Sequence, residues 1–285
     1  MPLNIHAIIL ALNEESFIEE TIKPIYSHLS GISVITQYDR DYYGNKVIPD
    51  STALKVLNYP DPEGKIHFVC RRFVDETSAR NMEMLSVLRN PIKGKQGHGV
   101  TMETIRKFHS KPDYFLIVDA DEIYDINTFG NIIKYLTEFK PNGLRVSGYN
   151  YVRSWNERIP LNIMDHKNFG FVKAGILFEM RRQVTWNESR IAKLLNILKL
   201  PDFSAKIFGF KDCPREIGLF HHGAYIGGDE RLAARKIKHS HPEVVNSDLQ
   251  EERKKLLTEK IKTLSLPENI RNGIWPIGFL ENKIE

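Results

Sequence analysis

The first 120 residues alternate between short apolar runs and amphipathic segments. Residues 5–12, 32–36, 66–70 and 114–118 are apolar runs of strand length. Runs of this kind predict buried strands, and the uninterrupted run at 114–118 predicts a strand that is buried on both faces of a sheet. Strands that alternate with helices build parallel sheets, so the pattern predicts an α/β fold with a mostly parallel sheet flanked by helices.

Helical spacing of apolar residues fills the intervals between these runs. Ile18, Ile22, Ile25 and Leu29 recur at this spacing, and Pro24 within the segment predicts a kink or an early end. Four further segments are predicted to be helices: residues 50–57, 76–88, 101–109 and 128–139.

The second half of the chain is mixed. Residues 144–152 have the period-2 character of a strand, and residues 153–186 predict irregular loops and antiparallel strands rich in aromatic residues. Further helices are expected at residues 189–200, 229–239 and 248–264, and a short strand at 217–222. We therefore divide the chain into a main domain, residues 1–225, and a helical C-terminal extension, residues 226–285. Within the main domain, the alternating strands and helices of residues 1–125 could hold a nucleotide, and residues 126–225 supply the aromatic, carboxylate and histidine side chains that a sugar or other polar acceptor requires.

The composition adds few constraints. The 285 residues are 41% hydrophobic and 27% charged, as in ordinary globular proteins, and the net charge of +4 is too small to indicate nucleic-acid binding. Cys70 and Cys213 have no metal-site spacing and predict buried thiols in a reducing compartment. No leader or membrane-spanning run is present, so the sequence predicts a cytoplasmic protein, peripheral to a membrane if its acceptor is lipid-linked.

Three carboxylates directly follow the strand predicted at residues 114–118. They are Asp119, Asp121 and Glu122. Ligands of open α/β sheets bind at the carboxyl ends of the strands, and paired carboxylates suit Mg²⁺ or Mn²⁺ that also contacts a substrate phosphate. The alternative interpretation of this short pattern is a solvated acidic turn.

Other predicted strand ends carry polar signals in a defined order. Residues 11–15 read Ala-Leu-Asn-Glu-Glu, Asp39 follows the second strand, residues 78–81 read Ser-Ala-Arg-Asn, and residues 221–223 read His-His-Gly. Together with Asp-Ala-Asp-Glu at 119–122, this ordered set resembles family 2 glycosyltransferases of the GT-A fold, over roughly residues 4–240.

The resemblance implies a nucleotide-diphosphate-sugar donor and a hydroxyl acceptor on a glycan or on a lipid-linked or protein-linked sugar. It implies a divalent cation, Mn²⁺ or Mg²⁺, ligated by Asp121 and His221, with Asp119 and His222 as the alternatives. The residues that it places at the nucleotide are Leu12, Asn13, Glu14, Asp39, Arg71, Arg80, Asp119 and Ala120.

Family 2 enzymes invert the anomeric carbon, so a single carboxylate is expected to act as general base on the acceptor hydroxyl. In similar sequences this carboxylate follows a segment that contains Trp, some tens of residues past the metal motif. Residues 178–188 match that segment and favour Glu188, with Asp165 and Glu179 as alternatives.

Two other functional classes stay open. A sugar nucleotidyltransferase is disfavoured because residues 13–15 lack the Gly-rich basic signature of that class, whereas a nucleotide-sugar or glycan-binding protein without catalysis is compatible with the pattern. The C-terminal helices could support an oligomer.

Overall fold

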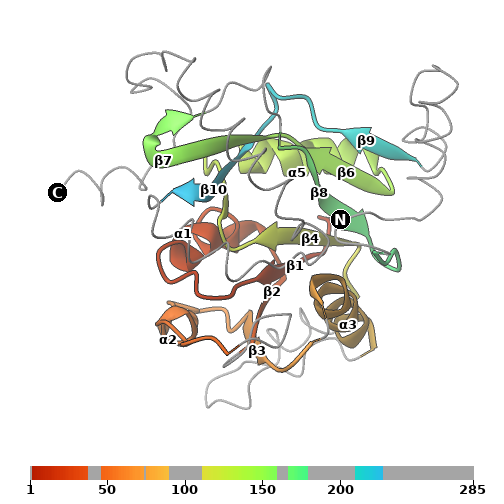
Figure 1. Ribbon diagram of the computed structural model, residues 1–285. Helices are drawn as coiled ribbons and strands as arrows, with labels where there is room; N and C mark the ends of the chain where they lie inside the picture. Colours follow the sequence, from red (N-terminus) through yellow and green to blue (C-terminus); the bar gives the residue numbers. More distant parts are fainter. Residues whose placement is uncertain are drawn as a thin grey trace, which may run out of the picture.

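The computed structural model describes residues 2–37, 46–73, 75–89, 111–158, 166–178 and 209–226. Its main element is a seven-stranded sheet in the order β3-β2-β1-β4-β8-β6-β9, which runs from the bottom to the top of Figure 1. The strands are β1 (Ile5–Leu10), β2 (Gly31–Thr36), β3 (Ile66–Cys70), β4 (Tyr114–Asp119), β6 (Gly143–Val146), β8 (Asn168–Lys173) and β9 (Phe210–Asp212).

The first four strands of the sheet are parallel, as the sequence predicted. β1 pairs with β2 and β4, and β2 pairs with β3, all in parallel register. β8 then runs antiparallel to both β4 and β6, and β9 is parallel to β6. The predicted mixed, mostly parallel sheet flanked by helices is confirmed.

The helices pack on both faces of this sheet. They are α1 (Ile18–Ile22), the 3-10 helix η1 (Tyr26–His28), α2 (Thr52–Asn58), α3 (Glu76–Arg89) and α5 (Phe129–Phe139). The helix predicted over residues 18–29 ends at Ile22, just before Pro24, and the chain continues as η1. The helices predicted at 101–109, 189–200 and beyond residue 229 lie outside the described residues.

Alternate residues of the buried strands enter two different cores. Ile5, Ala7 and Ile9 of β1 pack with apolar residues of α1 and α5, whereas Ile8 and Leu10 pack with residues of α3. Because neighbouring side chains of a strand point to opposite faces, a strand covered by helices on both sides is apolar at most positions. This explains why β1 is apolar at every position except His6.

A second, three-stranded sheet extends from the end of β4. Its order is β5 (Glu122–Tyr124), β10 (Phe220–Ile226) and β7 (Gly148–Arg158), with β10 antiparallel to β5 and parallel to β7. The strand predicted over 144–152 is therefore two strands, which belong to different sheets and separate at Ser147. A side chain at Gly148 would collide with the ring of Phe220, so the change of sheet requires glycine there.

Two minor expectations can also be compared with the structure. Cys213 is buried as predicted, but Cys70 is exposed at the end of β3, so that part of the prediction is wrong. The last residue of a strand can lie beyond the helices that cover the sheet, and the apolar pattern does not show where that cover stops.

Within the described ranges, the chain forms no helix with the length and apolar character needed to cross a bilayer.

Candidate functional site

Asp119, the last residue of β4, is held by a buried arginine. Arg80 of α3 is 1% exposed and places Nη2 2.7 Å from Oδ1 of Asp119, while its Nη1 lies 3.3 Å from Oε2 of Glu76. The side chain of Asp119 remains 35% exposed. Arg80 thus fixes one oxygen of Asp119 and leaves the carboxylate accessible at the edge of the sheet, where parallel strands place their ligands.

Glu122 is a buried anchor for the turn after β4. Its Oε2 accepts a hydrogen bond from the backbone N–H of Asp119 at 3.2 Å, and its Oε1 accepts one from Nδ2 of Asn168 at 3.1 Å. Nε2 of His166 lies 3.4 Å from the same Oε1. Glu122 is 1% exposed. These contacts give Glu122 a structural role. The sequence alone does not decide whether Glu122 contacts the acceptor or is exposed to solvent.

Asp121 lies beside His222, although the two residues are far apart in the sequence. Antiparallel pairing of β10 with β5 places His222 opposite Glu122, and the backbone N–H of Gly223 donates to the carbonyl oxygen of Asp121 at 2.8 Å. Nε2 of His222 is then 3.8 Å from Oδ2 of Asp121. The His-Gly pair thus reaches the acidic motif through strand pairing.

His221 lies on the other face of β10. It is fully buried, and its Nδ1 is 2.8 Å from the hydroxyl oxygen of Tyr151. Successive side chains of a strand alternate between faces, so only one residue of the His pair can face Asp121. The structure brings His222, the alternative ligand, to Asp121 and places His221 in the core of the small sheet.

The loop after β1 is joined to the segment before α2. Asn13 has a positive φ of 54°, and its side chain donates to the carbonyl oxygen of Ile48 at 2.8 Å and accepts from the backbone N–H of Asp50 at 3.2 Å. The backbone N–H of Glu14 donates to Oγ1 of Thr52 at 2.8 Å.

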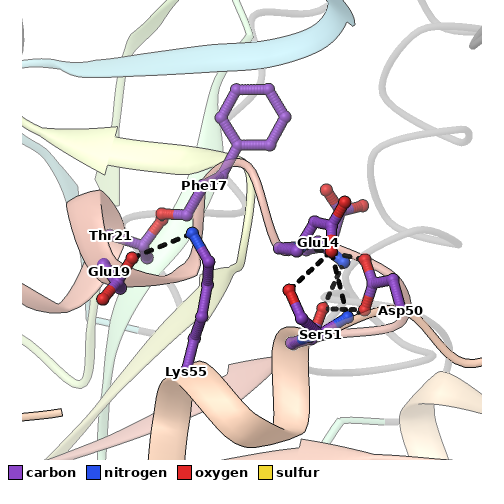
Figure 2. Close-up of polar contacts among 9 residues, drawn as sticks. Glu14, Phe17, Glu19, Thr21, Asp50, Ser51 and Lys55 are labelled. Atoms are coloured by element: carbon purple, nitrogen blue, oxygen red, sulfur yellow. Dashed lines mark hydrogen bonds and ion pairs between the residues drawn. The ribbon is translucent and has the colours of Figure 1, made fainter. Parts of the chain in front are cut away.

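The same junction continues toward the helices. Figure 2 shows Glu14 close to Asp50 and Ser51, and Lys55 of α2 reaching Glu19 of α1, with 3.0 Å between Nζ and Oε2. We call residues 13–15 together with residues 48–52 the two-loop junction. It follows the carboxyl end of β1, on the β2 side of β4. Leu12, Asn13 and Glu14 are all partly exposed there.

Arg71 follows β3 and belongs to a second polar group. Its Nη2 is 3.3 Å from Oε2 of Glu83, a buried residue of α3. Oε1 of Glu83 accepts from the hydroxyl of Ser33 at 2.8 Å and lies 3.6 Å from Nδ1 of His67. Because the Ser33 hydroxyl donates to Glu83, the contact of 2.9 Å between Ser33 and His6 requires Nε2–H of His6 to be the donor. We call these five residues the core cluster.

Burial has opposite consequences for the two titratable groups at the centre of the core cluster. Complete burial lowers the pKa of His6 to about 4, partly offset by the charge of Glu83. For Glu83, burial acts to raise the pKa, but contacts with His67 and Ser33 and the charges of His67 and His6 outweigh it, so the pKa lies below its usual value. The cluster therefore holds Glu83 ionised and His6 neutral.

The groups around the end of β4 form a contrasting set, which we call the edge cluster: Arg80, Asp119, Asp121, Glu122, His166 and His222. The rings of His166 and His222 stack with centroids 4.0 Å apart and an interplanar angle of 22°. His166, Asn168 and Asn150 belong to this region but were not predicted. They lie in a segment whose sequence has no motif, and only strand pairing brings them to Asp121.

A divalent ion can be tested against the donor atoms of the edge cluster. Among the described residues, no group of three or more His, Cys, Asp or Glu side chains forms a metal centre. Asp121 and His222 nevertheless offer an oxygen and a nitrogen 3.8 Å apart. Ligands on adjacent octahedral positions of an ion with bonds of about 2.1 Å lie roughly 3 Å apart, so a small adjustment would allow both to bind. The residues fit an ion that completes its coordination with substrate.

Four predicted site residues lie outside the described residues. They are Asp39, from the proposed nucleotide site, and the three candidate bases Asp165, Glu179 and Glu188. The described chain does approach the segment of the bases. Asn81 of α3 donates from Nδ2 to the carbonyl oxygen of Phe178 at 2.6 Å and accepts from its N–H at 2.9 Å.

Comparisons with known proteins give only distant similarities. No protein-family model and no curated protein matches the sequence. Among solved structures, TarS of S. aureus is 12% identical with a TM-score of 0.41, over 82% of this chain and 38% of TarS. GalNAc-T7 with UDP, GalNAc and Mn²⁺ is 13% identical with a TM-score of 0.40, over 81% of this chain and 46% of that one.

A third similarity covers less of the chain. Glucosyl-3-phosphoglycerate synthase from Mycobacterium tuberculosis with Mg²⁺ and UDP is 13% identical with a TM-score of 0.31, over 52% of this chain and 44% of that one. In these three comparisons the chain spans less than half the length of the solved protein.

Proposed function

We propose that the protein is a metal-dependent, inverting glycosyltransferase that moves a sugar from a nucleotide-diphosphate donor to a hydroxyl acceptor. One observation carries the proposal. At the carboxyl end of a central parallel strand, Asp119 is held by a buried arginine, and Asp121 faces His222 from a distant strand. A decorative acidic turn would not need a fully buried Arg80 or a paired histidine.

The nucleotide would lie along the ends of β1, β2 and β4. Asp119, fixed by Arg80 but still accessible, is suited to accept hydrogen bonds from ribose hydroxyls. The junction of residues 13–15 with 48–52 would border the base, together with Asp39. Arg71, exposed beyond the end of β3, would contribute positive charge on the same side.

Asp121 and His222 would hold the divalent cation, and the place of His221 on the other face of β10 supports the choice of His222 over His221. An oxygen and an imidazole nitrogen suit Mn²⁺ better than Mg²⁺, because Mg²⁺ strongly prefers oxygen ligands. When bound, such an ion would neutralise charge on the departing diphosphate.

The acceptor side would be supplied by the small sheet and by the segments before His166 and after Phe178. A carboxylate there, with Glu188 preferred over Asp165 and Glu179, would take the proton from the acceptor hydroxyl as it attacks the anomeric carbon. The hydroxyl must approach from the face opposite the diphosphate. The base and the two metal ligands, Asp121 and His222, therefore belong on opposite sides of the sugar.

The test is a donor panel with a metal series. UDP-, GDP- and dTDP-sugars are incubated with Mn²⁺ or Mg²⁺, and binding and release of nucleoside diphosphate are measured separately. We expect one nucleotide class to bind and to be hydrolysed slowly without an acceptor. Binding without hydrolysis or transfer to any acceptor would favour a non-catalytic nucleotide-sugar protein, and no binding by any donor would refute the proposal.

A further inference from the structure

We propose that Asn150 is a positioning residue that fixes the tautomer of His222, so that the ring presents the lone pair of Nε2 toward Asp121. This inference rests on the proposed function, because it assigns His222 as a metal ligand. Oδ1 of Asn150 lies 2.8 Å from Nδ1 of His222. An amide oxygen can only accept a hydrogen bond, so Nδ1 must carry the proton. Nε2 is then the unprotonated nitrogen of a neutral ring.

The backbone enforces this contact. Asn150 of β7 and His222 of β10 are register partners in the parallel pair, and His222 is also paired with Glu122 of β5. His222 therefore lies on the central strand of the small sheet, between a neighbour that fixes Nδ1 and the strand that begins beside Asp121. Asn150 is completely buried, so water does not compete for the hydrogen bond.

His166 fixes the plane of the same ring. The two imidazoles stack at 4.0 Å, and Nε2 of His166 accepts a hydrogen bond from Nδ2 of Asn168 at 2.8 Å, while that amide also donates to Oε1 of Glu122 at 3.1 Å. With only the hydrogen bond at Nδ1, the ring of His222 could still rotate about that bond. Stacking against the ring of His166 restricts this rotation. With both, Nε2 can point only toward the carboxylate of Asp121, which is 3.8 Å away.

A hydrogen-bond partner on the non-ligating nitrogen of a histidine strengthens metal binding by that histidine. Histidine binds metals as the neutral ring, and a hydrogen bond from the other ring nitrogen selects the ligating atom. Loss of an outer partner of this kind typically lowers metal affinity by about 10–100-fold. Asn150 is thus expected to act on the ion through His222, without contacting either ion or substrate.

The first test reads the tautomer in the parent protein and uses one substitution only to assign the signals. Long-range ¹H–¹⁵N spectra of the metal-free protein at about pH 8, where an ordinary imidazole is neutral, report the tautomer of each histidine. The signals of His222 are identified by their loss in His222→Gln. We expect the Nδ1–H tautomer. The Nε2–H tautomer would overturn the inference, because Asn150 would then be donating its amide to the ring.

The second test compares two replacements of Asn150. Asn150→Asp keeps an acceptor for Nδ1–H, whereas Asn150→Leu has a similar size and keeps none. Binding of Mn²⁺ in the presence of UDP is measured by the electron paramagnetic resonance signal of free Mn²⁺, with thermal unfolding as the check on folding. We expect Asn150→Leu to lose about 10–100-fold in Mn²⁺ affinity and Asn150→Asp to stay within about threefold of the parent protein.

Asp121→Ala separates failure of this inference from failure of the proposed function. If Asp121→Ala loses Mn²⁺–UDP binding and Asn150→Leu binds as the parent does, Asn150 has no positioning role and the metal site stands. If Asp121→Ala also binds normally, the ion is not at this site and the proposed function itself fails. Should Asn150→Leu not fold, weak Mn²⁺ binding by a folded Asn150→Asp together with the Nε2–H tautomer would still overturn the inference.

Discussion

The core cluster and the edge cluster are both polar groups built around a buried residue of α3, Glu83 in one and Arg80 in the other, but they balance charge differently. The core cluster sets one carboxylate, Glu83, against one guanidinium, one hydroxyl and two imidazoles. The edge cluster gathers three carboxylates around one guanidinium and two imidazoles. A buried group of charges is tolerated when it is paired, so the core cluster is complete without a ligand.

The excess of carboxylates distinguishes a site from a structural network. At the edge cluster, Arg80 serves Asp119 while Asp121 faces an imidazole, so the arrangement would be stabilised by a cation. We therefore expect substitutions in the edge cluster to lower activity more than stability, and substitutions in the core cluster to do the reverse. Four measurements test this contrast.

The largest effect is expected for Asp121→Asn. The amide has the size of the carboxylate but a much weaker attraction for a divalent ion, so turnover of the donor should fall by about 10³-fold, or roughly 4 kcal/mol in barrier height. Steady-state kinetics over a Mn²⁺ series give the loss, and thermal unfolding should change little. Full activity of Asp121→Asn would remove the edge cluster from the reaction.

The next effect concerns the pH dependence of stability at His6. Its folded pKa of about 4 lies below the value of about 6.5 for an exposed histidine, so between these pH values only the unfolded chain takes up the proton. The stabilisation is complete above about pH 6.5 and is lost as the pH falls to 4, a change of about 3 kcal/mol. Urea unfolding at several pH values should show this loss in the parent protein and its absence in His6→Asn. Parallel pH profiles for the two proteins would contradict the assignment.

A smaller loss is expected for Glu83→Gln. Replacing the buried carboxylate weakens its contacts with Ser33, His67 and Arg71, which should cost about 2 kcal/mol in the free energy of unfolding. Glu138→Gln is the matched control, because that residue lies exposed on α5 and the change should alter stability by less than about 0.5 kcal/mol. Donor KM should stay unchanged in both. A large rise of KM in Glu83→Gln alone would show that the core cluster serves the site through Arg71.

The smallest effect is expected at the junction of residues 13–15 with 48–52. Asn13→Gly keeps the positive φ but removes the two hydrogen bonds to Ile48 and Asp50, so donor KM should rise about fivefold, or roughly 1 kcal/mol, with kcat unchanged. Ser30→Ala is the control, because it removes one hydrogen bond to Ile5 at the opposite end of the strands. Equal KM values for the two variants would place the nucleotide away from this junction.

The parallel half of the fold could be predicted because its pattern is local. A strand buried on both faces is apolar at most positions, so β1, β2 and β4 could be located to within one or two residues. The break at Ser147 could not, because residues 143–158 look like one extended segment until the chain has two sheets to join. The strand end at Cys70 was similarly hidden, since exposure there depends on where the neighbouring layer stops.

By itself, the sequence determined at which strand end the acidic residues lie. Asp119 and Asp121 follow an apolar run, and a run of that kind ends at the edge of a parallel sheet, so their place is a consequence of local pattern. Tertiary structure alone decided their partners. Arg80 reaches Asp119 from a helix, and His222 rather than His221 reaches Asp121 because pairing of β10 with β5 sets the register. A shift of one residue in that register would exchange the two histidines, and no property of the His-His pair in the sequence encodes the choice.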